Sequence, residues 1–287
     1  MKAFPITSAL HFVRGFTPSQ STTNMSVERY LDQNFPSGHT FVEGGADFDE
    51  LRRHLLREAD SYILHATSWY ARSLMSLRSS ASSWCLVGLY YSAFYAGKAI
   101  MSILGCWKES DKSWIEVSFA NPGQQKLVHH KGNKDKYSTK YPAPGPGGSH
   151  REFWYAYYSA VGPLNAWISP SGQYAIKPMS ASYTWFIDLR NKVNYDAIEA
   201  FKLMRTYELQ YKATNLPHCF PGDLSSAYQV SKGFLSALQE IGKYCGLSTD
   251  LFKPAQSRES ALRKLVNGPR KRPVYLFASK ESSNVIF

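Results

Sequence analysis

Two consecutive stretches with helical periodicity constrain the fold of this chain more than any other feature. Over residues 47–77, apolar positions recur at steps of three and four, which is typical of the buried face of one long α-helix. Asp47 is predicted as the N-cap of this helix, with Glu50 three positions later as in a capping box. The apolar stripe consists of Phe48, Leu51, Leu55, Tyr62, Ile63, Ala66, Tyr70, Leu74 and Leu77.

A second helix is predicted over 81–104, after a short polar break and before Gly105. It is apolar on nearly every side, so it is expected at the centre of the fold, covered all round. Two long helices joined by a short turn form an antiparallel hairpin. Residues 84–107 are also long enough to span a membrane, but Lys98 and several Ser and Tyr residues within the stretch favour a buried central helix.

The predicted fold class is mainly α, an antiparallel helical bundle with a small β-containing insertion. Regular helix is predicted again at about 179–193 and 224–245, and a short helix near 26–32. The predicted regions are an irregular N-terminal arm (1–45), a helical hairpin (46–105), an insertion (106–178), the remaining bundle helices (179–249) and a basic C-terminal tail (250–287).

The insertion has a different texture from the helices on either side of it. Residues 114–119 alternate as a strand does, and the turn residues Asn121-Pro122-Gly123 follow. Residues 127–128 are predicted to return as a second strand, and 152–164 to form an aromatic helix. Long connections of this kind usually carry function or are disordered.

The charge balance favours polyanionic partners. The chain has 33 Lys and Arg against 22 Asp and Glu, a formal net charge of +11, so RNA or single-stranded nucleic acid is the expected partner. Two roles are open for the aromatic rings of the insertion. They stack on unpaired bases of the nucleic acid, or they are buried in the core. The rings are Trp114, Tyr137, Tyr141, Phe153, Trp154, Tyr155, Tyr157 and Tyr158. The predicted phosphate contacts are Lys126, His129, His130, Lys131, Lys134, Lys136, Lys140 and Lys192.

Several common kinds of site are absent from the sequence. It contains no GxxxxGK[ST] or GxGxxG phosphate loop, no HExxH and no GxSxG nucleophile elbow. The four cysteines form no CxxC pair, so no metal site and no cofactor are predicted. The N-terminal segment lacks the unbroken apolar stretch that a signal peptide requires. The expected location is therefore cytoplasmic, without membrane association.

Two segments carry a resemblance to a known family. Leu89-Tyr90-Tyr91-Ser92-Ala93-Phe94-Tyr95-Ala96-Gly97-Lys98-Ala99-Ile100 resembles the second helix of bacterial HEPN (higher eukaryotes and prokaryotes nucleotide-binding) domains. Phe186-Ile187-Asp188-Leu189-Arg190-Asn191-Lys192-Val193-Asn194-Tyr195-Asp196 is similar to the third-helix signature of that family, in the form that ends in tyrosine. The resemblance covers about 47–245 and implies a bundle of HEPN type.

The resemblance implies metal-independent RNA cleavage, in which arginine holds the scissile phosphate, histidine moves the proton, and two protomers meet. Carried over, Arg190 is the phosphate contact and Asn191 the polar residue beside it. Asn194, Tyr195 and Asp196 stand where the histidine is expected. Asparagine does not exchange a proton usefully, tyrosine has too high a pKa, and the Asp196 carboxylate is too weak a base at neutral pH. The expected function is an RNA- or nucleotide-associated component of a bacterial toxin or phage-defence system, working as a homodimer or with a protein partner.

Three alternatives stay open at the level of sequence. The chain is a ribonuclease, or it is a non-catalytic binding or scaffold subunit of a nucleoprotein complex. Arg190 acts on phosphate, or it is a surface arginine paired with Asp188 or Asp196. His129 and His130 supply the missing base or bind metal as a pair, or they lie in a solvated basic loop.

Overall fold

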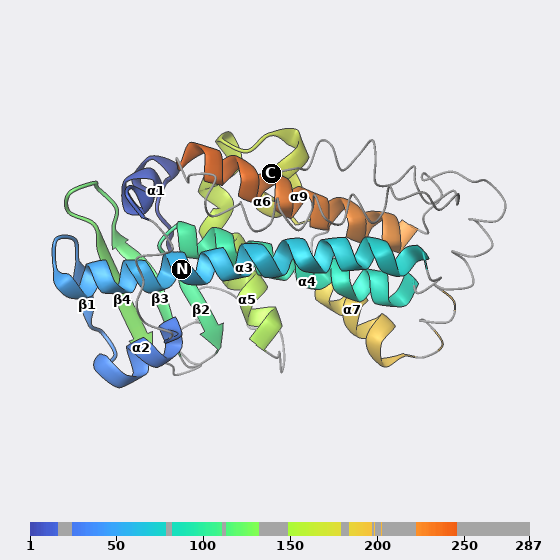
Figure 1. The fold of residues 1–287 in the computed structure, drawn as a ribbon, viewed down its shortest axis with the longest axis horizontal. Helices are drawn as coiled ribbons and strands as arrows, with labels where there is room; N and C mark the ends of the chain where they lie inside the picture. The colour runs from blue at the N-terminus through green and yellow to red at the C-terminus, as the bar shows by residue number, and fades with distance from the viewer. Residues whose placement is uncertain are drawn as a thin grey trace, which may run out of the picture.

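The computed structural model is mostly helical, with one small antiparallel sheet at one end of a long central hairpin (Figure 1). Helices lie along both sides of this hairpin, and the sheet packs beside its first turns. The residues that the structure describes are 1–16, 25–78, 82–110, 113–131, 149–178, 184–196, 198, 202 and 222–245.

The central hairpin is formed by α3 (Ala46–Arg78) and α4 (Ser82–Ile103), which confirms the two long predicted helices. α3 buries Phe48, Leu51, Leu55, Ile63, Ala66 and Tyr70, the described members of the predicted stripe other than the half-buried Tyr62. α4 stops before Gly105, whose φ of +71° is a left-handed conformation that favours glycine.

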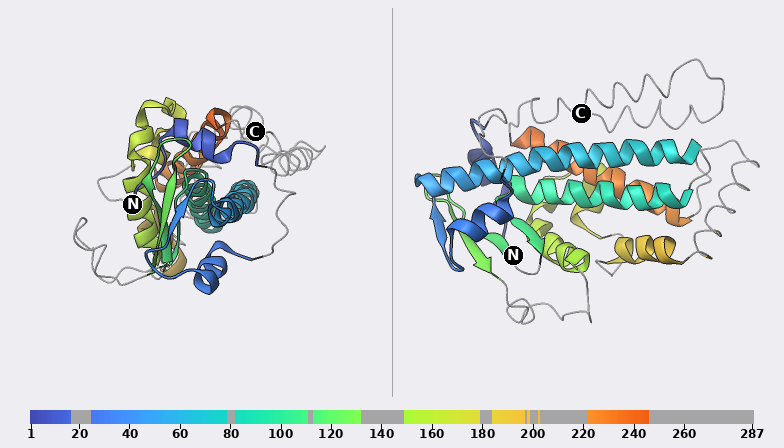
Figure 2. Two further views of the ribbon diagram at one scale, coloured as in Figure 1. Left: turned by 90° about the vertical axis from the view of Figure 1, so that its left-hand side faces the viewer. Right: turned by 60° about the horizontal axis from the view of Figure 1, so that its bottom comes forward.

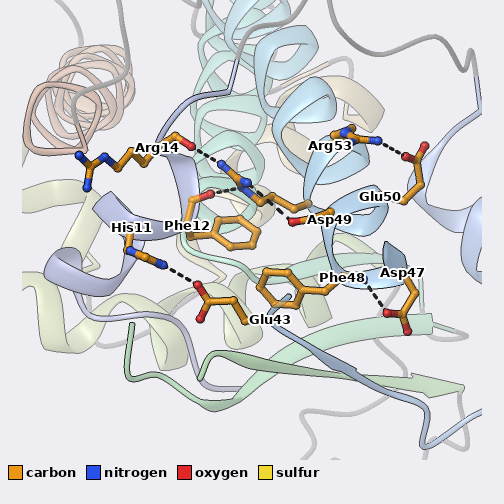
Figure 3. Close-up of polar contacts among 10 residues, drawn as sticks. His11, Phe12, Arg14, Glu43, Asp47, Phe48, Asp49, Glu50 and Arg53 are labelled. Atoms are coloured by element: carbon orange, nitrogen blue, oxygen red, sulfur yellow. Dashed lines mark hydrogen bonds and ion pairs between the residues drawn. The ribbon is translucent and has the colours of Figure 1, made fainter. Parts of the chain in front are cut away.

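The predicted capping box at the start of α3 is wrong. The helix begins one residue before Asp47, whose side chain accepts a hydrogen bond from the Phe48 amide at 2.9 Å. Glu50 does not reach back to the helix start, because its carboxylate pairs with Arg53 at 2.7 Å (Figure 3). The same carboxylate also lies 3.5 Å from His54.

α4 is covered within its own chain. α3 and α9 (Gly222–Tyr244) pack on it, and α5 (Ser149–Val161) and α7 (Trp185–Tyr195) lie one after the other along another side (Figure 2). An added Cβ at Gly97 would lie 3.3 Å from the Phe153 ring and 3.4 Å from the Phe234 ring, so α5 and α9 approach α4 closely here. The predicted central position of this helix is confirmed.

None of the described helices is long and apolar enough to cross a membrane. In α4 itself, Lys98, Ser92 and Ser102 are buried among the apolar side chains. The structure therefore favours the buried central helix over the membrane span.

The sheet joins two regions that the sequence analysis treated separately. β2 (Trp107–Ser110), β3 (Ser113–Phe119) and β4 (Lys126–Lys131) come from the predicted insertion, and confirm its two strands and the turn at Gly123. β1 (Thr40–Val42) from the predicted arm pairs antiparallel with β4, giving the order β1-β4-β3-β2.

The described part of the first 45 residues contains more regular structure than predicted. They contain α1 (Ile6–Val13) and α2 (Val27–Asn34), the second of which confirms the short helix near 26–32. Arg52 of α3 donates hydrogen bonds to the carbonyls of Phe12 and Arg14 at the C-terminal end of α1 (Figure 3). These carbonyls lack partners within the helix, so the arginine caps it and fixes α1 to the hairpin.

The remaining elements match the predictions in part. α5 accounts for most of the helix expected over 152–164. It is followed by the 3-10 turns η3 (Gly162–Ala166) and η4 (Pro170–Gly172) and by α6 (Gln173–Ile176). α9 agrees with the helix predicted over 224–245. The first residues of the helix predicted over 179–193 and the basic tail lie outside the described residues.

Candidate functional site

Arg190 connects the two segments that carry the family resemblance. On α7, its Nη2 donates a hydrogen bond to the hydroxyl of Tyr91 on α4, and its Nη1 donates to Asn191 Oδ1 at 2.6 Å. The guanidinium carbon lies 5.2 Å from the centre of the Tyr91 ring and 5.6 Å from that of Tyr90. These contacts hold the cation against the aromatic surface of α4.

The surface ion pair proposed as an alternative for Arg190 is not formed. Asp188 instead accepts hydrogen bonds from Arg151 at 2.5 Å and from Thr184 at 2.9 Å. The Nε of Arg190 is buried and has no hydrogen-bond partner among the described residues. An unsatisfied buried donor costs about 1–3 kcal/mol, so this arrangement is more costly than that of an ordinary surface arginine.

A pocket of about 390 Å³ lies beside Tyr91, between α3, α4 and the first turn of α5. This volume falls in the lower part of the range found for small-molecule sites. α3, α4 and α5 all contribute to its wall. The lining residues are Ser61, Tyr62, His65, Tyr91, Phe94, Tyr95, Lys98 and His150.

Stacked rings form a continuous wall along the seam of the hairpin. On α3, Tyr62, His65 and Trp69 recur at steps of three and four residues and therefore share one face. On α4, Tyr91 and Tyr95 do the same. His65 stacks on Tyr95 at 5.0 Å between ring centres, and Trp69 on Tyr91 at 5.3 Å. Rings held in this way offer rigid apolar surface with little loss of side-chain entropy on binding.

Apart from the tyrosines, the titratable groups in the pocket lining are all basic. Lys98 is 7% exposed, and its Nζ lies 5.1 Å from the Tyr62 ring centre and 5.2 Å from that of Phe94. His65 and His150 are the other two, and no carboxylate is among the eight lining residues. Glu58 lies behind Tyr62, where it accepts that hydroxyl at 2.9 Å. The lining therefore favours an anion.

Several contacts hold His150 against α4. Its Nδ1 lies 2.7 Å from the Tyr90 hydroxyl, and its ring stacks on Phe94 at 4.4 Å. The same hydroxyl accepts the Trp154 indole N–H at 3.3 Å, and burial raises the pKa of Tyr90 well above its usual value. A hydroxyl oxygen has two lone pairs, so that of Tyr90 can also accept an Nδ1–H of His150, the tautomer that leaves the Nε2 lone pair free.

The structure brings together some of the predicted motif residues. Asn191 binds Arg190, and the Tyr195 ring lies 6.0 Å from the Arg190 guanidinium on the solvent side, with 76% of the residue exposed. Asn194 and Lys192 are exposed on the same helix. No imidazole stands at positions 194–196.

The predictions for His129 do not fit the structure. Its side chain is fully buried in β4, and Nε2 lies 2.9 Å from the Ser113 hydroxyl. Burial, reinforced by the Lys131 charge, lowers its pKa to about 4. His130 lies on the opposite face of the strand, stacked on Trp114 and 3.2 Å from Glu116. The two histidines therefore form neither a basic loop nor a metal-binding pair, and His129 is not placed to contact nucleic acid.

The aromatic residues of the insertion mostly belong to the core, as the alternative had it. Phe153, Trp154 and Tyr157 are each no more than 3% exposed, and Trp114 is 6% exposed. These rings are not available for base stacking. Tyr137 and Tyr141 lie outside the described residues.

The predicted lysines have mixed outcomes. Lys126 is exposed on β4, while Lys131 pairs with Asp32 at 3.5 Å. Lys134, Lys136 and Lys140 lie outside the described residues.

The sequence analysis missed most of this pocket. The spacing of Tyr62, His65, Tyr95 and Lys98 at one-turn intervals on adjacent helices was a usable signal for the α3 and α4 walls. His150 had no such signal, because its position depends on how α5 packs against α4.

No family model, curated protein or solved structure matches the chain. Within the described parts of the chain, no group of three or more His, Cys, Asp or Glu side chains is placed to hold a metal ion.

Proposed function

We propose that this protein binds RNA or a nucleotide in the pocket beside Tyr91, with Arg190 and Lys98 as phosphate contacts. The observation that carries the proposal is the combination of an aromatic wall with three basic side chains in one pocket. Arg190 lies next to this pocket, hydrogen-bonded to the lining residue Tyr91. A nucleotide has the complementary pair of features, a flat base and a negative phosphate.

The family resemblance supports the same proposal. The two segments on which it rests contact each other through Arg190 and Tyr91. One lies on the central hairpin and the other on α7, a helix that packs against it. On this basis we propose a bundle of HEPN type, and a role within a bacterial toxin or phage-defence system alongside a protein partner or second copy. The absence of an imidazole at positions 194–196 supports the second candidate, a binding or scaffold subunit that does not cleave.

Binding is tested with a fluorescein-labelled single-stranded RNA of ten nucleotides, by fluorescence anisotropy, with mononucleotides as competitors. Arg190→Ala and Lys98→Met should each raise Kd about tenfold, equivalent to about 1.4 kcal/mol. The methionine keeps most of the apolar contacts of the buried lysine.

The matched controls are Arg53→Ala and Lys243→Met. Arg53 is exposed two helical turns before Ser61 on α3, and Lys243 is exposed near the end of α9. Both controls should bind as the unaltered protein does. The proposal fails if the pocket variants bind RNA and nucleotides as tightly as these controls, with all four proteins folded by circular dichroism.

A further inference from the structure

Two histidines that belong to neither family motif line the same pocket. His65 is exposed on α3, and His150 lies in the first turn of α5. In the sequence, His65 precedes α4 and His150 follows it, so only the folding of the chain brings both side chains to one pocket. Imidazole is the side chain whose ordinary pKa, about 6.5, suits both accepting and donating a proton near neutral pH.

We propose that His65 and His150 act as a general base and general acid pair that cleaves RNA at this pocket, within a single chain. The inference rests on the proposed function, because it requires RNA to bind there. It differs from what the family resemblance implies, since neither imidazole comes from the Arg190 helix and no second protomer is needed to complete the site.

The fixed orientation of His150 supports a catalytic role. The Tyr90 hydroxyl bonds Nδ1 at 2.7 Å, and the ring stacks on Phe94. A base oriented by a hydrogen bond to its second nitrogen is the arrangement that nucleophile activation uses generally. Tyr90 is in turn held by Trp154, so it is a positioning residue for His150.

Arg190 and His150 flank the same tyrosine. The Tyr91 ring centre lies 5.2 Å from the Arg190 guanidinium carbon and 6.2 Å from the His150 ring centre. A phosphodiester at Tyr91 would therefore lie near a cation and an imidazole, with Lys98 and His65 further along the same pocket.

The chemistry balances without a further reactant. One imidazole takes the proton of the ribose 2′-hydroxyl, and the 2′-oxygen forms a bond to phosphorus. The bond from phosphorus to the 5′-oxygen breaks, and the other imidazolium gives its proton to that oxygen. The products are a 2′,3′-cyclic phosphate and a 5′-hydroxyl, while Arg190 and Lys98 stabilise the charge on the non-bridging oxygens.

The test uses the full chain, a 5′-labelled RNA and the DNA of the same sequence, with EDTA in every reaction. DNA lacks the 2′-hydroxyl, so it should bind without being cleaved. The unaltered protein should cleave RNA to 2′,3′-cyclic phosphate ends, detected by mass spectrometry. His65→Gln and His150→Gln should each lower the rate about 10²- to 10⁴-fold. Their Kd for the DNA should rise no more than about tenfold, far less than the rate falls.

The control is His39→Gln, at a half-buried histidine that pairs with Asp47 outside the pocket, and this variant should cleave at the unaltered rate. His65 is exposed, so its variant tests the inference even if His150→Gln does not fold. The rate of the unaltered protein should also be proportional to concentration if one chain holds the whole site.

The inference is overturned if the unaltered protein binds RNA but forms no cyclic phosphate, or if both histidine variants cleave normally. Either result leaves the proposed binding function standing. Failure of the proposed function would show differently, as RNA binding that ignores Arg190→Ala and Lys98→Met.

Discussion

Arg190 donates a hydrogen bond to the hydroxyl of Tyr91, 99 positions earlier in the chain, and its guanidinium lies over the same ring. The residue that the family resemblance marks as the phosphate contact is therefore also the one that fixes α7 to the central helix. Binding at the pocket and packing of α7 should be coupled through this pair.

Tyr91→Phe tests the coupling, because it removes the hydroxyl and keeps the ring. The free energy of unfolding should fall by about 1 kcal/mol, the usual net contribution of one hydrogen bond. Urea denaturation of Tyr91→Phe, Arg190→Ala and the double variant forms a cycle, and the double variant should lose less stability than the two single variants together. Strict additivity would show that the two side chains do not interact in solution.

The part of the fold set by local pattern could be predicted from the sequence. The stripe on α3 and the apolar run of α4 are repeated over many turns, so each helix is specified by its own residues. By contrast, β1 has three residues and becomes a strand only by pairing with β4. α1 is a single short helix whose end is capped by Arg52, 38 positions after Arg14.

The candidate site was predicted only in part for the same reason. Arg190 was identified from a contiguous motif, but His150 reaches the pocket through the docking of α5 on α4. His129 and His130 were treated as equivalent because they are adjacent. The alternation within a strand separates them, burying His129 and leaving His130 half-exposed. Extending the predicted strand past Leu127 and Val128 would have anticipated this difference.

Glu58 joins three elements, so its replacement should be strongly destabilising. Its carboxylate accepts the Val27 amide at 2.8 Å, and the Tyr62 hydroxyl and the Trp107 indole at 2.9 Å each. Glu58→Ala would leave three donors without this acceptor, and should lower the free energy of unfolding by about 2–4 kcal/mol.

The control for Glu58 is Glu50→Ala. Glu50 makes a pair with the exposed Arg53 on the same helix, and such a pair contributes little, so about 0.5 kcal/mol is expected. Urea denaturation monitored by tryptophan fluorescence measures both. Equal losses in the two variants would contradict the assigned role of Glu58.

Two glycines with similar backbone conformations should respond differently to alanine. Gly105 has φ +71°, and an added Cβ would lie 2.4 Å from Phe4 Cε2. Gly123 has φ +83° with nothing within 4 Å of an added Cβ. Gly123→Ala should cost only the backbone penalty, about 1–2 kcal/mol. Gly105→Ala should cost at least about 1 kcal/mol more, because Phe4 is buried and must move. Thermal unfolding of both variants decides the point, and equal losses would show that Phe4 yields without cost.

The buried His129 should make stability depend on pH. Its pKa is lowered from 6.5 to about 4 in the folded protein, mainly by burial. Between these two values the unfolded chain binds more protons than the folded one, so stability rises with pH. The contribution is complete above about pH 6.5 and is lost as the pH falls towards 4. One pKa unit corresponds to about 1.4 kcal/mol, so the loss should not exceed about 3 kcal/mol.

His129→Gln removes this titration while leaving an amide that can still bond the Ser113 hydroxyl. Other groups also titrate over this range, so the informative quantity is the difference between the variant and the unaltered protein. Urea denaturation at pH 7.5, 6, 5 and 4.5 should show that the variant is less stable at neutral pH and loses less stability on acidification. Parallel curves for the two proteins would mean that His129 is protonated in the folded state much as it is in the unfolded chain, and that its burial does not control its charge.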